Sequence, residues 1–174
     1  MLVRTLALFG LGCLASLQAA EWKQFRGPDG LGASEKAAPT KWSATENIAW
    51  KTPLPPGTSS PVFHKDTIFI TSYSGYNVPG EGRGDPSNLK RHLHALDRAT
   101  GKVLWTKDFT AKLPEQDNIR DGHGYASSTL AVDDDAIYAF FGKSGVHAFD
   151  HSGKTLWSAD VGEKLNGWGS AASP

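Results

Sequence analysis

Short alternations of apolar and polar residues, rather than helical stripes, dominate the chain from Ser59 onward. The stretches "SSPVFHKDTIFITS", opening at Ser59, and "SSTLAVDDDAIYAFF", opening at Ser127, each give a short apolar segment, a polar turn and a second apolar segment. The second segments, Ile68–Ile70 and Ile137–Ala139, are rich in β-branched and aromatic residues, and an aspartate stands in each turn. This pattern is typical of a β-hairpin.

A second hairpin follows the first in both copies. The stretches "LHALDRATGKVLW" (Leu93–Trp105) and "VHAFDHSGKTLW" (Val146–Trp157) repeat one another. The first copy predicts a strand over Leu93–Leu96, a turn over Asp97–Gly101 and a returning strand that starts at Lys102, because Asp and Gly favour tight turns. Each repeat therefore predicts four short antiparallel strands, which make one blade of a β-propeller.

The tryptophans extend this repeat toward the N-terminus. The stretch "NIAWKTPLP" aligns with "KVLWTKDF", so Trp50, Trp105 and Trp157 stand 55 and 52 residues apart. A period near fifty fits a propeller blade with its loops. Helical repeats are excluded, because no window between Ser59 and Trp157 holds an apolar stripe of helical period without interruption.

These residues resemble the tryptophan-docking motif of the PQQ-like (quinoprotein-like) β-propeller family. The resemblance implies that each tryptophan, Trp50 included, packs between neighbouring blades and that an alanine lies beneath it. The stretch "WKQFRGPDGLGAS" is also similar to the start of exported bacterial members. The matching residues are Ala95, Asp97, Thr100, Gly101 and Trp105 in one copy, and Ala148, Asp150, Gly153 and Trp157 in the other, where Ser152 replaces the threonine.

The final stretch, "WGSAASP", matches the openings of the two repeats. We therefore expect the last strand of one blade, two whole blades and the first residues of a third. Closed propellers contain at least four blades. Residues 21–174 are accordingly expected to form the N-terminal part of a longer propeller domain, with closure of the ring by several copies as the alternative.

Residues 1–20 have the pattern of a secretory signal peptide. Arg4 precedes an apolar run over Thr5–Leu17, and small residues follow at Ala19 and Ala20. The run is too short for a permanent membrane span. We therefore expect a periplasmic or secreted protein without a transmembrane segment after cleavage.

Cys13 is the only cysteine and lies inside this predicted leader. A mature chain without it would have no disulfide and no cysteine metal site. Alternatively, "GLGC" is a lipoprotein signal in which Cys13 carries the lipid and anchors the protein to the outer membrane.

The charge pattern and the known catalytic motifs narrow the function classes. Eighteen basic and eighteen acidic residues balance, and no basic stripe is present, which excludes a nucleic-acid partner. The sequence has no G-x-S-x-G elbow, phosphate-binding loop or zinc-protease helix motif. We expect no catalytic residues.

Two loops are candidate binding sites, because ligand contacts concentrate in long loops. The first is the insertion Tyr73–Arg91, and the second is Asn118–Ser128, which precedes the innermost strand of a blade. The candidate residues are Arg83 and Arg91 in the first loop, and Arg120, Asp121, His123 and Tyr125 in the second.

No metal site is predicted. His92 and His94 lie on one face of a strand, but His147 repeats His94, which favours a role in blade architecture. Zinc would also need a further convergent ligand. The run Asp133–Asp135 lacks the alternating spacing of a calcium loop and is interpreted as a hairpin tip.

Three functions fit these observations. The first is an exported, non-catalytic scaffold for a protein partner in the cell envelope, which the resemblance implies through the assembly-factor lipoproteins of the outer-membrane barrel machinery. The second is a fragment of a quinoprotein dehydrogenase that holds pyrroloquinoline quinone with calcium. The third is sugar binding by exposed Tyr73, Tyr76 and Tyr125. We favour the first and predict no cofactor for it.

Overall fold

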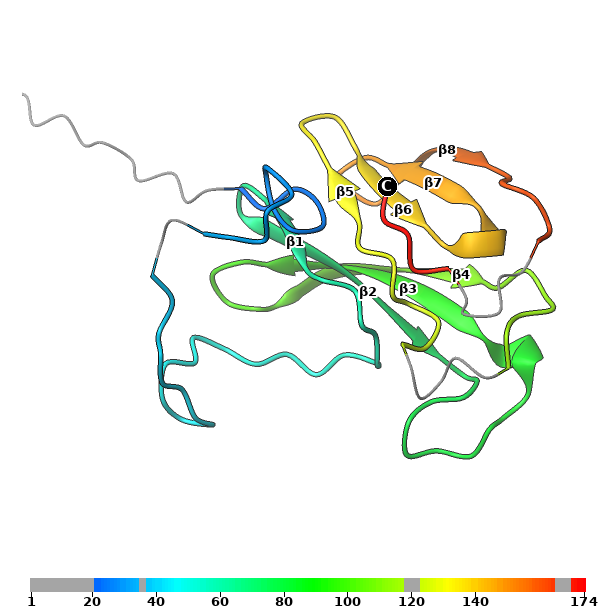
Figure 1. Ribbon diagram of the computed structural model, residues 1–174, viewed down its shortest axis with the longest axis horizontal. Helices are drawn as coiled ribbons and strands as arrows, with labels where there is room; N and C mark the ends of the chain where they lie inside the picture. Colours follow the sequence, from blue (N-terminus) through cyan, green and yellow to red (C-terminus); the bar gives the residue numbers. More distant parts are fainter. Residues whose placement is uncertain (1–20, 35–36, 118–122, 165–169) are drawn as a thin grey trace, which may run out of the picture.

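The computed structural model describes residues 21–34, 37–117, 123–164 and 170–174. In this part of the chain, two antiparallel sheets of four strands stack face to face (Figure 1). The first contains β1 (Val62–His64), β2 (Thr67–Ser74), β3 (Lys90–Asp97) and β4 (Val103–Thr110). The second contains β5 (Ala131–Val132), β6 (Ile137–Phe140), β7 (Val146–Phe149) and β8 (Thr155–Ala159). Single turns of 3-10 helix, η1 (Pro86–Asn88) and η2 (Gly142–Ser144), follow β2 and β6. The predicted all-β fold with four-stranded antiparallel blades is confirmed.

Each sheet carries the same irregularity beside its tryptophan. Ala95 lies opposite Trp105 in the first sheet, and Ala148 lies opposite Trp157 in the second. The register shifts directly after the alanine in both sheets, so the leucine before each tryptophan is an extra residue on the outer strand. Because a bulge of this kind bends and twists a strand, the outer strands of both sheets bend at equivalent positions.

The turn between the last two strands is also the same in both sheets. The Oδ1 atom of Asp97 accepts hydrogen bonds from the backbone N of Thr100 at 2.8 Å and from its hydroxyl at 2.6 Å. Asp150 accepts the same two bonds from Ser152, at 2.9 and 2.6 Å. The hydroxyl bond is the main cause that holds the pKa of each aspartate below its usual range.

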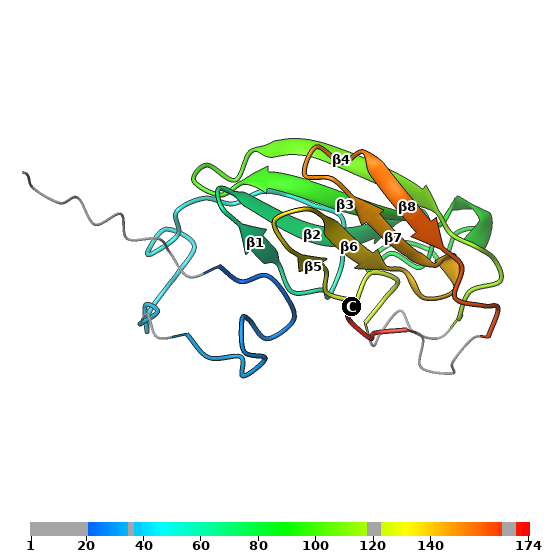
Figure 2. The same cartoon turned by 90° about the horizontal axis from the view of Figure 1, so that it is seen from above.

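An apolar core fills the space between the two sheets. Alternate residues of each strand point to opposite faces, and one face of each sheet supplies this core. Figure 2 shows the sheets overlapping with their strands in the same order. The buried core residues are Val62, Phe69, Leu93, Ala95, Leu130, Val132, Ile137, Ala139, Phe141 and Phe149, with Trp105 and Phe109 packed against them.

The connections divide between the two ends of the sheets. The short turns at 65–66, 98–102 and 150–154 lie at one end, which we call the turn end. The long connection 75–89 and the described parts of the connection between β4 and β5, 111–117 and 123–130, lie at the other end, which we call the loop end (Figure 1). A second buried cluster supports the loop end and consists of Tyr73, Tyr76, Leu89, Ala111, Tyr125 and Ala126.

The segment "NIAWKTPLP" lies against the turn end of the first sheet. The sequence predicts a strand here, but the structure assigns none, because none of the described strands pairs with it. Its side chains nevertheless bond to the turn between β3 and β4. The indole nitrogen of Trp50 donates to the Arg98 carbonyl at 3.0 Å, and the Thr52 hydroxyl donates to the Gly101 carbonyl at 2.5 Å.

The openings of successive repeats are linked by hydroxyl groups. The backbone N of Ser60 donates to the Thr129 hydroxyl at 3.0 Å, and the backbone N of Thr129 donates to the Ser173 hydroxyl at 3.1 Å. Residues 170–174 therefore make with the second repeat the contact that the second repeat makes with the first.

The predicted signal peptide, residues 1–20, lies outside the described residues, and so does the lipidation candidate Cys13. In the part of the chain that the structure describes, no helix is long and apolar enough to cross a membrane.

Candidate functional site

Two loops that the sequence marks separately meet at the loop end. The hydroxyl of Tyr76, in the first loop, donates to the Asp117 carboxylate at 2.9 Å. The amide nitrogen of Asn77 donates to the Asp117 carbonyl and to the Tyr125 hydroxyl, both at 3.1 Å. The two candidate loops thus pack against one another, although 118–122 of the second loop are not described.

Arg83 closes the base of the first loop. Its Nη2 atom lies 2.9 Å from a carboxylate oxygen of Asp117, and its Nε atom donates to the Tyr76 hydroxyl at 3.0 Å. The bond from Arg83 to Tyr76 is the main cause that raises the pKa of Arg83. The separate bond that Tyr76 donates to Asp117 is the main cause that lowers the pKa of Asp117. Both charged side chains are largely exposed, at 60% and 67%, so a partner can contact them.

Arg91 is buried and joins the two sheets. Its guanidinium lies 2.5 Å from the Glu115 carboxylate, and the two side chains are only 5% and 8% exposed. Two further bonds run to the Tyr125 carbonyl at 2.9 Å and to the Ser144 hydroxyl at 3.0 Å, and Ser144 lies in η2, which connects β6 and β7 of the second sheet. Each of the three guanidinium nitrogens of Arg91 therefore has a hydrogen-bond partner inside the fold, as the burial of a charged group requires.

Tyr125 lies under the surface rather than on it. Its ring packs edge-on against Tyr73 at 5.4 Å and also contacts Tyr76, and the three tyrosines are at most 4% exposed. Burial raises the pKa of Tyr125. The hypothesis that these three tyrosines are exposed for stacking on sugars is therefore wrong, because they form the second apolar cluster.

The other candidates of the second loop are only partly placed. The Nδ1 atom of His123 lies 2.9 Å from the Ser127 hydroxyl, and its carbonyl accepts a bond from Thr58 at 2.8 Å. Arg120 and Asp121 lie outside the described residues. Binding by these three residues stays a prediction.

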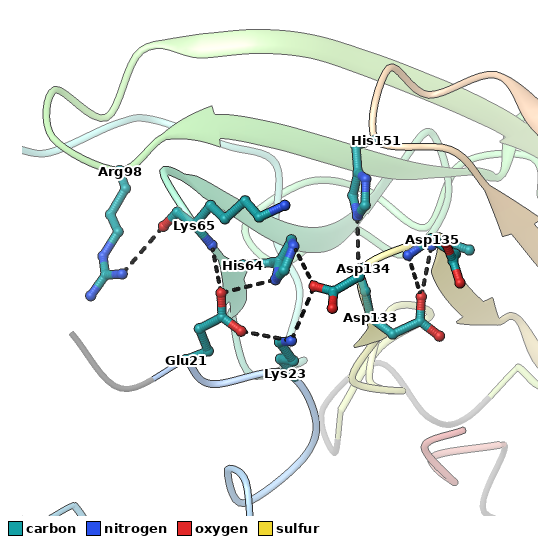
Figure 3. A network of polar contacts seen from close by, with 10 residues as sticks. Glu21, Lys23, His64, Lys65, Arg98, Asp133, Asp134, Asp135 and His151 are labelled. Atoms are coloured by element: carbon teal, nitrogen blue, oxygen red, sulfur yellow. Dashed lines mark hydrogen bonds and ion pairs between the residues drawn. The ribbon is translucent and has the colours of Figure 1, made fainter. Parts of the chain in front are cut away.

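The turn end holds a second polar cluster around His64 (Figure 3). This ring is 4% exposed, with Nδ1 3.1 Å from Glu21 and Nε2 3.2 Å from Asp134. Neither contact has the alignment of a hydrogen bond. Lys23 lies 2.6 Å from Glu21 and 3.5 Å from Asp134, and two positive groups thus alternate with two carboxylates when His64 is protonated.

This cluster ties the start of the described chain to both sheets. Trp22 pairs with Phe63 beside the first sheet, and the Lys23 carbonyl accepts a bond from Val132 in the second at 2.8 Å. A hollow of about 1380 Å³ beside it is lined by side chains of both charges.

Two tryptophans of the repeat contact equivalent turns, and the third is half-exposed. Trp50 contacts the Gly101 turn, and the Trp105 indole lies against Gly153 and donates to the His151 carbonyl at 3.2 Å. Trp157 is 47% exposed. The first two indoles therefore contact the same turn in successive sheets.

The histidines form cross-strand hydrogen bonds. The Nδ1 atom of His94 lies 2.9 Å from the Thr106 hydroxyl, and that of His147 lies 2.8 Å from the Ser158 hydroxyl at the equivalent position. His92 lies within hydrogen-bond distance of the Asp108 carboxylate and the Ser74 hydroxyl, both at 2.8 Å. Among the described residues, no group of three His, Cys, Asp or Glu side chains is placed to hold a metal ion.

Residues 36–174 match the model of the family described as outer membrane protein assembly factor BamB. The chain belongs to this family. The predicted resemblance to PQQ-like propeller repeats is thereby confirmed. A comparison with curated protein sequences gave no match.

Among solved structures, BamB from Moraxella catarrhalis shares 24% sequence identity with the chain, with a TM-score of 0.36. The match covers 63% of this chain and 30% of the Moraxella chain. The BamB-like chain described here thus spans less than a third of that relative.

Proposed function

We propose that this BamB-like chain is an exported, non-catalytic scaffold that binds a protein partner of the outer-membrane assembly machinery through its loop end. The family description supports the kind of partner. The loop end is proposed as the binding surface because the base of the loop 75–89 is closed. This base fixes an exposed tip in position before any partner arrives.

The base is closed by backbone and side-chain contacts together. Tyr76 pairs with Gly84 as an isolated bridge, and the backbone N of Asn77 donates to the Arg83 carbonyl at 2.8 Å. The Arg83–Asp117 ion pair then joins this base to the second loop. A loop held in this way loses little conformational entropy on binding, which favours affinity.

The tip itself, residues 78–82, is exposed over Pro79–Gly82. Backbone N of Glu81 donates to the Val78 carbonyl at 3.1 Å, so the tip has its own turn. Exposed backbone and one carboxylate suit hydrogen bonding to a protein surface. The partner contact is therefore expected at the tip and at the adjacent ion pair.

Site-specific photo-crosslinking in the native host tests this proposal. A photoreactive residue at Pro79 is expected to crosslink the full-length protein to a component of the outer-membrane assembly machinery, identified by mass spectrometry. The same residue at Ala99, in the exposed turn at the other end of the first sheet, is the matched control. Equal crosslinking from both positions, or none from Pro79, would contradict the proposal.

The absence of catalysis is tested separately. The purified full-length protein is incubated with pyrroloquinoline quinone and calcium, and its absorbance spectrum and alcohol oxidation are measured. We expect neither a bound quinone band nor turnover. A stoichiometric quinone band would overturn the non-catalytic assignment and would favour the dehydrogenase alternative.

A further inference from the structure

A serine, a histidine and an aspartate form a hydrogen-bonded chain across three neighbouring strands. Ser74 ends β2, His92 lies in β3, and Asp108 lies opposite His92 in β4. The Nε2 atom of His92 lies 2.8 Å from the Ser74 hydroxyl, and its Nδ1 atom lies 2.8 Å from an Asp108 carboxylate oxygen. The three groups therefore stand in the order hydroxyl, imidazole, carboxylate.

The carboxylate decides which ring nitrogen carries the proton. Ionised Asp108 can only accept hydrogen bonds, so the Nδ1 atom of His92 must donate to it. In the neutral ring Nε2 is then an acceptor, and the Ser74 hydroxyl donates to it. This is the arrangement in which a histidine serves as a base toward a serine hydroxyl.

The neighbouring positions give a natural comparison. His94 makes the same two kinds of contact, to the Ser72 hydroxyl at 2.7 Å and to Thr106 at 2.9 Å. Thr106 takes the place of the carboxylate, and a hydroxyl can donate as well as accept. Nothing therefore fixes the His94 tautomer, and Ser72 is not aligned with a carboxylate-backed base.

The chain of three residues is accessible from solvent. Ser74 is partly exposed, and the Asp108 side chain is 57% exposed. Ser72, by contrast, is only 1% exposed. Ser74 and Asp108 therefore both meet solvent, one on each side of His92.

We propose that Ser74 is an activated hydroxyl that accepts acyl groups from small activated esters. The Ser74 oxygen attacks the carbonyl carbon while its proton passes to Nε2 of His92. The carbon–oxygen bond to the leaving alcohol breaks, and the alcohol takes the proton from His92. The products are one free alcohol and one chain acylated on Ser74, and no repeated turnover is included.

Covalent labelling of the full-length protein tests this inference. The probes are p-nitrophenyl acetate and a fluorophosphonate, which reports on activated serines by the same attack. Intact mass and peptide mapping are expected to show a single adduct on Ser74. No adduct on Ser74, under conditions that label a serine hydrolase in the same tube, would overturn the inference without any variant.

Substitutions then separate activation from simple exposure. Asp108→Asn is expected to slow labelling at least tenfold, because the general base loses its orienting carboxylate. Thr106→Val, the matched change beside His94, should leave labelling unchanged. Thermal unfolding confirms that each variant is folded. Equal labelling rates for folded Asp108→Asn and the wild type would show that Asp108 does not act through His92.

Discussion

Trp105 of the first sheet lies against Gly153 of the second, in the turn between β7 and β8. A Cβ atom built on Gly153 would come within 3.2 Å of the Trp105 ring, and the indole nitrogen bonds to the neighbouring His151 carbonyl. The ring of one repeat thus covers the turn of the next. This contact joins the sheets at the turn end and does not involve the loops.

Trp105→Ala is expected to destabilise the chain by about 2–3 kcal/mol, because a partly buried indole and its hydrogen bond are both lost. Denaturant unfolding followed by circular dichroism measures the change. Trp157→Ala is the matched control, since this indole is 47% exposed, and a cost below about 1 kcal/mol is expected there. Equal costs would show that the contact with Gly153 contributes little.

The cost in stability of replacing glycine by alanine should depend on the space around the glycine, and three glycines of similar backbone conformation allow a comparison. Gly101, Gly153 and Gly80 all have φ between 71° and 86°. A Cβ atom on Gly101 would overlap the Trp50 ring, and one on Gly153 would lie 3.2 Å from the Trp105 ring. One on Gly80 would meet nothing within 4 Å. Gly80→Ala is expected to cost about 1 kcal/mol, through backbone strain alone. Gly101→Ala should cost the most, and thermal unfolding of the three variants checks the order.

The buried Arg91–Glu115 pair should matter far more than the exposed Arg83–Asp117 pair. Glu115→Ala leaves a buried guanidinium without its carboxylate and is expected to cost about 3–5 kcal/mol. Arg83→Ala removes an exposed ion pair and should cost no more than about 1 kcal/mol. Denaturant unfolding gives both values, and a small loss for Glu115→Ala would mean that Arg91 reaches water.

The stability of the fold is expected to fall as pH is lowered, through His94. Burial, followed by the like charge of His92, lowers the pKa of His94 to about 4. In the unfolded chain this pKa returns to about 6.5. Between these values the unfolded state binds more protons than the folded state, so acid favours unfolding. The resulting loss of folding stability begins as the pH falls below about 6.5 and is complete by about pH 4, where it amounts to at most about 3 kcal/mol.

Unfolding of the wild type and of His94→Gln at about pH 7 and about pH 5 measures this contribution. The wild type should lose more stability than the variant between the two conditions. The same pH dependence in both proteins would assign the effect to other groups.

The hairpins and their turn could be predicted from sequence because their determinants are local. Asp97 and Thr100 bond to one another across three residues, and the equivalent bond joins Asp150 and Ser152. A short motif of this kind needs no tertiary contact to be recognised. Its repetition at a fixed spacing then predicts that the two copies form equivalent sheets.

The polar contacts between elements could not be predicted in the same way. Glu115 lies 24 residues from Arg91, and Asp134 lies 70 residues from His64, so the pairing follows only from the fold. One signal was available for each buried partner. Arg91 stands two residues before the core residue Leu93 in β3, and His64 stands two residues after Val62 in β1, so each lies on the same strand face as a core residue. Alternation alone therefore predicts that both are buried.

For the three tyrosines of the second cluster, the sequence predicts exposure where the structure shows burial. A loop position predicts exposure, yet Tyr76 and Tyr125 are at most 4% exposed because the two long connections pack on one another. A long loop with several aromatic residues can thus build its own small core, and the sequence does not say which residues turn inward.

The separation of the turn end from the loop end has an evolutionary consequence. The Trp105 indole contact that joins the two sheets lies at the turn end. The loop 75–89 begins and ends at the loop end, and its base is closed by the Tyr76–Gly84 bridge and the Arg83–Asp117 ion pair. Insertions or substitutions in its tip therefore leave the stacking of the sheets unchanged. The loop that we propose as the recognition surface is thus free to diverge from one lineage to another while the repeat that supports it stays the same.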